Sequence, residues 1–116
     1  MRQAGVLGEC GRLALQNIAR LAEDHTNAQA IARGIASLPG ITVCEPVESN
    51  LLYFKFSHPS IKYTDLHAYL KERGVLVGGE DQWNRIRIAC HLDVHKEDVP
   101  VVIDAFAAGI AALSTK

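Results

Sequence analysis

A helical pattern running from Arg2 to about Leu38 is the feature that most constrains how this chain folds. Apolar residues recur every seven positions on one helical face: Leu7, Ala14, Leu21, Ala28 and Ile35. Pro39 and Gly40 end the pattern. A continuous helix of this length would measure about 55 Å, whereas a compact chain of this size has a radius of gyration of about 13 Å. The helix must therefore either break or extend beyond the rest of the molecule.

Gly8 and Gly11 are the expected weak points, because a glycine in a helix interior costs about 1 kcal/mol relative to alanine. We expect a kink or a separate short segment near them, and a well-packed helix from Arg12 onward. Arg2 stands at the start of this helix, where free N–H groups and the helix dipole disfavour a cation. A cation beside free N–H groups suits an anion such as phosphate.

The remainder of the chain alternates between strand and helix patterns. Strands are predicted at Ile41–Cys44, Leu51–Phe56, Val75–Val77 and Asn84–Cys90. Helices are predicted at Tyr63–Arg73, with Gly74 as its C-terminal cap, and from Val99 to Leu113. In the second strand, Leu52, Phe54 and Phe56 share the face expected in the core. This order predicts an α+β fold in one domain, residues 1–116, with a small antiparallel or mixed sheet covered on one face by helices.

Composition excludes several classes of function. The formal net charge is −1, and no run of basic and aromatic residues indicates a nucleic-acid surface. No apolar stretch approaches the length of a membrane span, and no leader pattern opens the chain, so we expect a soluble, cytoplasmic protein with no membrane partner. Three widely spaced cysteines indicate reduced, buried thiols: Cys10, Cys44 and Cys90.

A basic row lies along the last predicted strand. Period-two alternation places Arg85 and Arg87 on one face, together with Trp83 and His91. An arginine held on a strand suits bidentate recognition of a carboxylate or phosphate. The alternative for this pair is a solvated sheet face, or ion pairing with the acidic turn at 80–81.

The cluster at the end of this strand only superficially resembles a metal site. His91 and His95 are four residues apart with Asp93 between them, but zinc binding at that spacing needs both histidines on one helical face. We instead expect a strand exit, with Asp93 or His95 capping the final helix and Asp98 closing a capping box. No metal is expected.

Taken together, four segments resemble the C-terminal third of the low-specificity L-threonine aldolases. They are MRQAGVL at 1–7, RLAEDHTNA at 20–28, Ser49-Asn50 entering a strand, and RIACHLDV at 87–94. The similarity spans essentially the whole chain, and MRQAG together with R-x-x-x-H-L-D-V is specific. The chain departs from the family at 8–11, which is mostly alanine there, and at Cys90, where the family usually has threonine.

The resemblance implies a fold-type-I enzyme dependent on pyridoxal phosphate, acting as a homo-oligomer on a small amino-acid substrate. Its reaction would cleave threonine or allo-threonine to glycine and acetaldehyde. Arg87 matches the arginine that binds the substrate carboxylate, and Arg2 matches an arginine that holds cofactor phosphate across a subunit interface. Arg85 matches no functional position, so we expect a surface or interface residue there.

The resemblance also implies that catalytic parts lie outside this chain. The family's Schiff-base lysine precedes the matched segment, and none of the five lysines here corresponds to it: Lys55, Lys62, Lys71, Lys96 and Lys116. We therefore expect no catalytic residue in this chain, and a truncated or excised small domain with its preceding linker helix, inactive alone. Two alternatives are a free-standing module that binds small carboxylates and an oligomerisation unit that pairs through the first helix.

Overall fold

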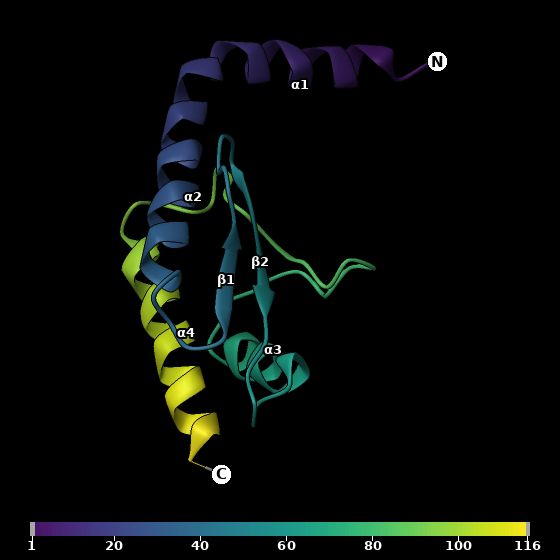
Figure 1. Cartoon of the computed structure of the whole chain (residues 1–116). Coiled ribbons are helices and arrows are strands. Elements are labelled where there is room, and N and C mark those ends of the chain that lie inside the picture. The colour runs from purple at the N-terminus through teal and green to yellow at the C-terminus, as the bar shows by residue number, and fades with distance from the viewer. Residues whose placement is uncertain (1, 116) are drawn as a thin grey trace.

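The computed structural model describes residues 2–115 and has the predicted α+β architecture. Its elements are α1 (Ala4–Gln16), a 3-10 turn η1 (Ile18–Arg20), α2 (Leu21–Ile35), β1 (Ile41–Cys44), β2 (Leu51–Phe56), α3 (Tyr63–Glu72), β3 (Ile86–Ala89) and α4 (Asp98–Ser114). The three strands form one antiparallel sheet in the order β1-β2-β3. Helices α2 and α4 run beside the sheet, and α3 lies at its end (Figure 1).

The register of the sheet separates an inner face from an outer one. Phe54 pairs with Val43 on β1 and Ile86 on β3, and these side chains point toward the helices. Tyr53 pairs with Cys44 and Arg87, so these three lie on the opposite face. The sheet is therefore apolar where the helices cover it and carries polar groups where they do not.

Close helix packing completes the core. The Phe54 and Phe106 rings meet edge to face at 5.6 Å, which joins β2 to α4. Gly34 of α2 lies against Ile103 of α4, where a Cβ would come within 2.2 Å of the Ile103 Cδ1 atom. Gly109 lies similarly close to Leu66 and Tyr69 of α3. The two glycines let the three helices approach one another closely.

The first helix breaks, but not at the predicted position. Both Gly8 and Gly11 lie within α1, and the helix ends at Asn17, where the chain turns through η1 into α2. A glycine cost of about 1 kcal/mol does not force a break; the break comes where the chain must turn to lay α2 on the core. No residue of α1 is buried, so the packed helix starts well after Arg12. The helix projects at an angle from the body (Figure 1), which accounts for a radius of gyration of 16.5 Å.

Other expectations about secondary structure meet mixed outcomes. Gly74 caps α3 as predicted: its φ is +78°, and the Val75 N–H donates to the Leu70 carbonyl at 3.0 Å. The predicted strand at Val75–Val77 is absent, and β3 is shorter than Asn84–Cys90. Between them, residues 78–85 form a turn-rich hairpin in which the Gly78 N–H donates to the Arg87 carbonyl. The short apolar run at 75–77 thus follows the edge of β3 without regular pairing.

Burial corrects two further predictions about side chains. Phe56 is only partly buried, because it lies at the end of β2 and stacks on His58 at 6.3 Å. Cys10 is exposed on α1 and Cys44 is partly buried, so only Cys90 is a buried thiol. In the described part of the chain, no helix has both the length and the apolarity to cross a membrane.

Candidate carboxylate-binding site

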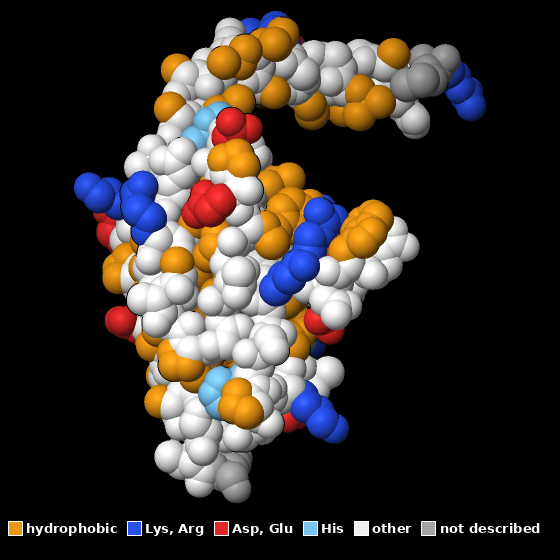
Figure 2. Space-filling view, in the orientation of Figure 1, with side chains coloured by type: hydrophobic (Ala, Val, Ile, Leu, Met, Phe, Trp, Pro, Cys, Tyr) orange, Lys and Arg blue, Asp and Glu red, His pale blue; other side chains and the backbone are white. Residues whose placement is uncertain are grey.

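The outer face of the sheet carries an open hollow of about 340 Å³ beside the 78–85 hairpin. Its lining combines cations, aromatic rings and backbone: Tyr53, Gly78, Gly79, Asp81, Trp83, Arg85 and Arg87. The hairpin projects from the body on the same side as α1 (Figure 1), and basic and apolar side chains lie next to one another between them (Figure 2). The predicted placement of Arg85 and Arg87 on one face is thus confirmed.

Arg85 is bound to Asp81 within the hairpin. The Arg85 Nε donates to the Asp81 Oδ2 atom at 3.0 Å, and the N–H groups of Arg85 and Trp83 donate to Oδ1, each at 2.9 Å. A terminal guanidinium nitrogen of Arg85 also forms an ion pair with Oδ2 at 2.9 Å. Burial raises the pKa of the Asp81 carboxyl, but these hydrogen bonds outweigh burial and hold the pKa below its ordinary value. The ion-pair alternative for Arg85 is therefore confirmed.

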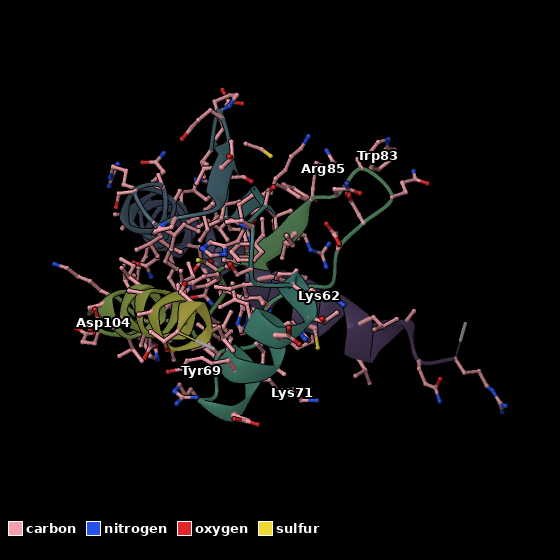
Figure 3. The ribbon with its side chains drawn as sticks, turned by 60° about the horizontal axis from the view of Figure 1, so that its bottom comes forward. Lys62, Tyr69, Lys71, Trp83, Arg85 and Asp104 are labelled. Atoms are coloured by element: carbon pink, nitrogen blue, oxygen red, sulfur yellow. The ribbon has the colours of Figure 1, made fainter. Side chains whose placement is uncertain are left out.

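Arg85 also lies close to two aromatic rings. Its guanidinium carbon is 4.7 Å from the Trp83 ring and 5.0 Å from the Tyr53 ring. Figure 3 shows Trp83 and Arg85 together on the projecting hairpin. Because Asp81 neutralises its charge and two aromatic rings lie near its guanidinium, Arg85 contributes first to the structure of the hairpin.

Arg87 is in a different situation on the same face. It is exposed in the middle of β3, opposite Tyr53, and within residues 2–115 its guanidinium has no hydrogen bond or ion pair. Its backbone is held on both sides, by β2 and by the Gly78 N–H at 2.9 Å. Gly78 can approach this closely because it has no side chain. A Cβ at this position would lie only 2.9 Å from the Arg87 carbonyl oxygen. Arg87 is thus an exposed cation on a fixed backbone, suited to bind a carboxylate.

Helix α3 anchors the base of the hairpin. The Tyr63 hydroxyl donates to the Gly78 carbonyl, and the His67 Nε2 atom contacts the Val77 carbonyl oxygen at 3.2 Å. Burial, with a smaller effect of Glu80, raises the pKa of Tyr63, so this hydroxyl keeps its proton and remains a donor.

A cluster of buried and partly buried polar residues fixes the far end of β3. The Asn50 side-chain amide donates to the Cys90 carbonyl at 2.8 Å, and the Cys90 N–H returns a bond to the Asn50 carbonyl at 2.8 Å. From α2, the Asn27 amide donates to the Val94 carbonyl at 3.1 Å. Asp24, 3% exposed, accepts a bond from Arg20 at 2.9 Å. Three of the four segments that carry the family resemblance therefore meet at this point.

Sequence reasoning assigned no role to these buried polar residues. A usable signal was present: Asp24 and Asn27 are three positions apart on α2, and Asn27 directly precedes buried Ala28. A polar residue on the buried side of a helix needs a partner. The cluster holds the strand that carries Arg87, so its contribution to the site is positional.

The other predicted site residues do not join Arg87. Arg2 is exposed, and the N-terminus lies at the free end of α1, away from the sheet (Figure 1). Asp98 accepts the His95 N–H at 2.8 Å, but α4 begins at Asp98 with Glu97 as its N-cap, so the prediction that Asp93 or His95 caps this helix is wrong. His91 is exposed, and its Nδ1 atom is 3.8 Å from a carboxylate oxygen of Asp93. Within residues 2–115, no group of histidine, cysteine and acidic residues could hold a metal ion.

The described residues fit only parts of a pyridoxal phosphate site. Arg2 precedes a helix whose first turn has no acidic residue, so cation and N–H groups there can face a phosphate. No lysine is among the residues that line the hollow at Arg87. Lys62 directly precedes α3 and Lys71 lies on it, both well apart from Arg85 (Figure 3), and Lys116 is outside the described residues. The described chain alone therefore does not fit the whole cofactor.

Comparison with curated sequences identifies close similarity along almost the whole chain. Low-specificity L-threonine aldolase 1 of Arabidopsis thaliana is 33% identical over 109 residues, 91% of this chain and 30% of the relative. Low specificity L-threonine aldolase of Escherichia coli O157:H7 is 33% identical over 112 residues, 96% of this chain and 32% of the relative. The chain thus spans about a third of the length of these relatives. No protein-family model matches it.

Solved structures share the fold at lower identity. A NifS-like protein matches 87% of this chain with a TM-score of 0.72 and 18% identity, over 31% of its own length. Glutamate decarboxylase of Lactobacillus brevis matches 82% of the chain with a TM-score of 0.69 and 19% identity, over 24% of its own length. A C-DES mutant with glycine covalently linked to its PLP cofactor matches 74% of the chain with a TM-score of 0.63 and 17% identity, over 23% of its own length.

These neighbours confirm the expected α+β fold, which they share over about a quarter to a third of their own length. The sequence relatives confirm the resemblance that MRQAG and R-x-x-x-H-L-D-V predicted. Along almost its whole length, this chain is therefore similar to low-specificity L-threonine aldolases, of which it spans about one third.

Proposed function

We propose that this chain is the C-terminal, substrate-carboxylate-binding domain of a pyridoxal-phosphate-dependent threonine aldolase, with α1 as its linker helix. The reaction of the whole enzyme would cleave L-threonine or L-allo-threonine to glycine and acetaldehyde. The observation that carries this proposal is Arg87, which is exposed on a braced strand and has no partner within residues 2–115. A homologous segment in aldolases of two organisms supports the same assignment.

Arg87 would bind the substrate through two parallel N–H···O bonds to its carboxylate. Such a fork fixes both the position and the plane of the carboxylate, which orients the Cα–Cβ bond for cleavage. The cofactor, when bound, would supply the electron sink for that cleavage. In this scheme Tyr53 and the hairpin border the hollow. The hydrogen bonds around Asn50 hold the end of β3 and so fix the position of Arg87 on this strand.

Arg2 would serve the cofactor phosphate, but not beside the Arg87 of its own chain. The projection of α1 carries Arg2 away from the sheet, so we place it at the site of a neighbouring subunit in a homo-oligomer. The exposed apolar residues of the first helical region support an interface there: Val6, Leu7, Leu13, Leu15 and Ile18. A cytoplasmic location is part of the same proposal.

The chain on its own would not catalyse the reaction, because no lysine lines the hollow in the described structure. A chimera tests the proposal. The matched third of the Escherichia coli aldolase is replaced by this chain, and acetaldehyde release from L-threonine is measured in the chimera and in the isolated chain. We expect release from the chimera alone. A folded but inactive chimera would favour a free-standing carboxylate-binding module or an oligomerisation unit.

A further inference from the structure

The hollow contains two arginines, but only one of them is available to a ligand. Arg85 and Arg87 are two residues apart and lie on the same face. Without a neighbouring acidic residue, their two positive charges would both act on a ligand in the hollow. Two adjacent guanidinium groups attract a dicarboxylate more strongly than a monocarboxylate. The selectivity of this surface therefore depends on whether the charge of Arg85 is neutralised.

Both carboxylate oxygens of Asp81 contact Arg85. A carboxylate offers about four acceptor positions; three hydrogen bonds from Arg85 and Trp83 and one further ion-pair contact with Arg85 surround the two oxygens of Asp81. Asp81 thus has little capacity left for a substrate ammonium group. Its negative charge cancels that of Arg85, and the hollow presents the single free charge of Arg87 among the described residues that line it.

We propose that Asp81 is a specificity-determining residue, which neutralises Arg85 so that the site at Arg87 selects amino acids carrying one carboxylate. This inference rests on the proposed role of Arg87. It also explains why two arginines on one face do not form a dicarboxylate site. Removal of the Asp81 charge would leave Arg85 and Arg87 as adjacent free cations and create such a site.

The chain carries its own reporter for a test. Trp83 is its only tryptophan, and its ring lies 4.7 Å from the Arg85 guanidinium carbon. We would titrate the chain with acetate and with succinate at constant ionic strength and neutral pH, and follow Trp83 fluorescence. The quantity compared is the ratio of the acetate Kd to the succinate Kd, which measures selectivity for a second carboxylate.

In the wild-type chain we expect little preference for succinate. In Asp81→Asn the ratio should rise about fivefold, equivalent to about 1 kcal/mol for an added exposed ion pair. The double variant D81N/R85Q should return the ratio to the wild-type value, and Asp81→Glu, which keeps the ion pair, should not change it. Asp81→Ser releases Arg85 while keeping an acceptor for the Trp83 N–H, so the result does not depend on one variant.

An unchanged ratio in folded D81N and D81S, or an equal rise in D81N/R85Q, would overturn the inference. The proposed function fails in a different way. If Arg87→Gln leaves acetate binding unaltered, Arg87 does not bind carboxylates in this chain, whatever the ratio in D81N. Circular dichroism and urea midpoints establish that each variant is folded.

Discussion

Asn50 and Cys90 are joined by two hydrogen bonds, each of 2.8 Å, which tie the start of β2 to the end of β3. Cys90 is 1% exposed, and its carbonyl would lose the side-chain hydrogen bond from Asn50 if that amide were removed. We expect Asn50→Ala to lower the free energy of unfolding by about 1–3 kcal/mol, the cost of an unsatisfied buried acceptor. Urea unfolding measures this change. Glu48→Ala is the control at an exposed neighbour, and equal stability of both variants would contradict the assignment.

Two glycines in different helices should respond in opposite ways to alanine. Gly34→Ala places a Cβ against Ile103 at 2.2 Å and should cost about 1–3 kcal/mol of stability through overpacking of α2 and α4. In Gly8→Ala the new Cβ meets no atom within 4 Å, so the substitution should stabilise the helical state of α1 by about 1 kcal/mol, the difference in helix propensity, and raise the helix content. Thermal melts and far-UV circular dichroism test both. A destabilised Gly8→Ala would mean that α1 packs against other atoms.

Stability should fall at alkaline pH because of two buried groups. Burial, with Asp24 as a smaller cause, raises the pKa of the Cys90 thiol, and burial with Glu80 raises the pKa of the Tyr63 phenol. The unfolded chain then loses these protons first, so their stabilisation is complete at neutral pH and is lost as pH rises past the ordinary thiol value of 9.0. Urea unfolding between pH 7 and 10.5 should show this loss, and the double variant C90A/Y63F should flatten it. An equally steep loss in the double variant would assign the effect to other groups.

The three thiols should differ in reactivity. Cys10 is exposed, Cys44 is partly buried and Cys90 is buried. We expect a thiol reagent to modify Cys10 first and Cys90 last in the folded chain, because reactivity follows access and thiolate content. Cys10→Ser should remove the fast phase, whereas Cys90→Ala should leave it unchanged. A fast phase that persists in Cys10→Ser would show that another thiol is exposed.

Local patterns predicted most of the elements because each had a strong signal. The alternation of residues 51–56 gives β2 with its exact bounds, and Gly74 ends α3 through its positive φ. The failed predictions depended on tertiary context. Val75–Val77 is β-branched enough to suggest a strand, yet its backbone lacks regular pairing, and the pairing of a strand is decided by its neighbour.

Some features of the site likewise followed from the local sequence pattern, whereas others depended on tertiary contacts. Alternation placed Arg85 and Arg87 on one face, but spacing alone could not tell which of them is neutralised. Asp81 reaches Arg85 because Asn84 turns the chain with a φ of +57°, a conformation that a period-two pattern does not contain. The hidden cluster at Asp24, Asn27 and Asn50 depends on contacts between distant segments, so only the fold brought it together.

The central claim is that Arg87 binds the substrate carboxylate, and the most direct test is the kinetics of L-threonine cleavage by the chimera. We predict that Arg87→Ala raises KM for L-threonine about 30- to 100-fold, as expected for the loss of about 2–3 kcal/mol in a charge-assisted hydrogen-bond pair. Arg85→Ala is the matched control and should change KM by less than about threefold, since an ion pair already occupies it. An unchanged KM in Arg87→Ala, or an equal rise in both variants, would contradict the proposal that Arg87 binds the substrate carboxylate.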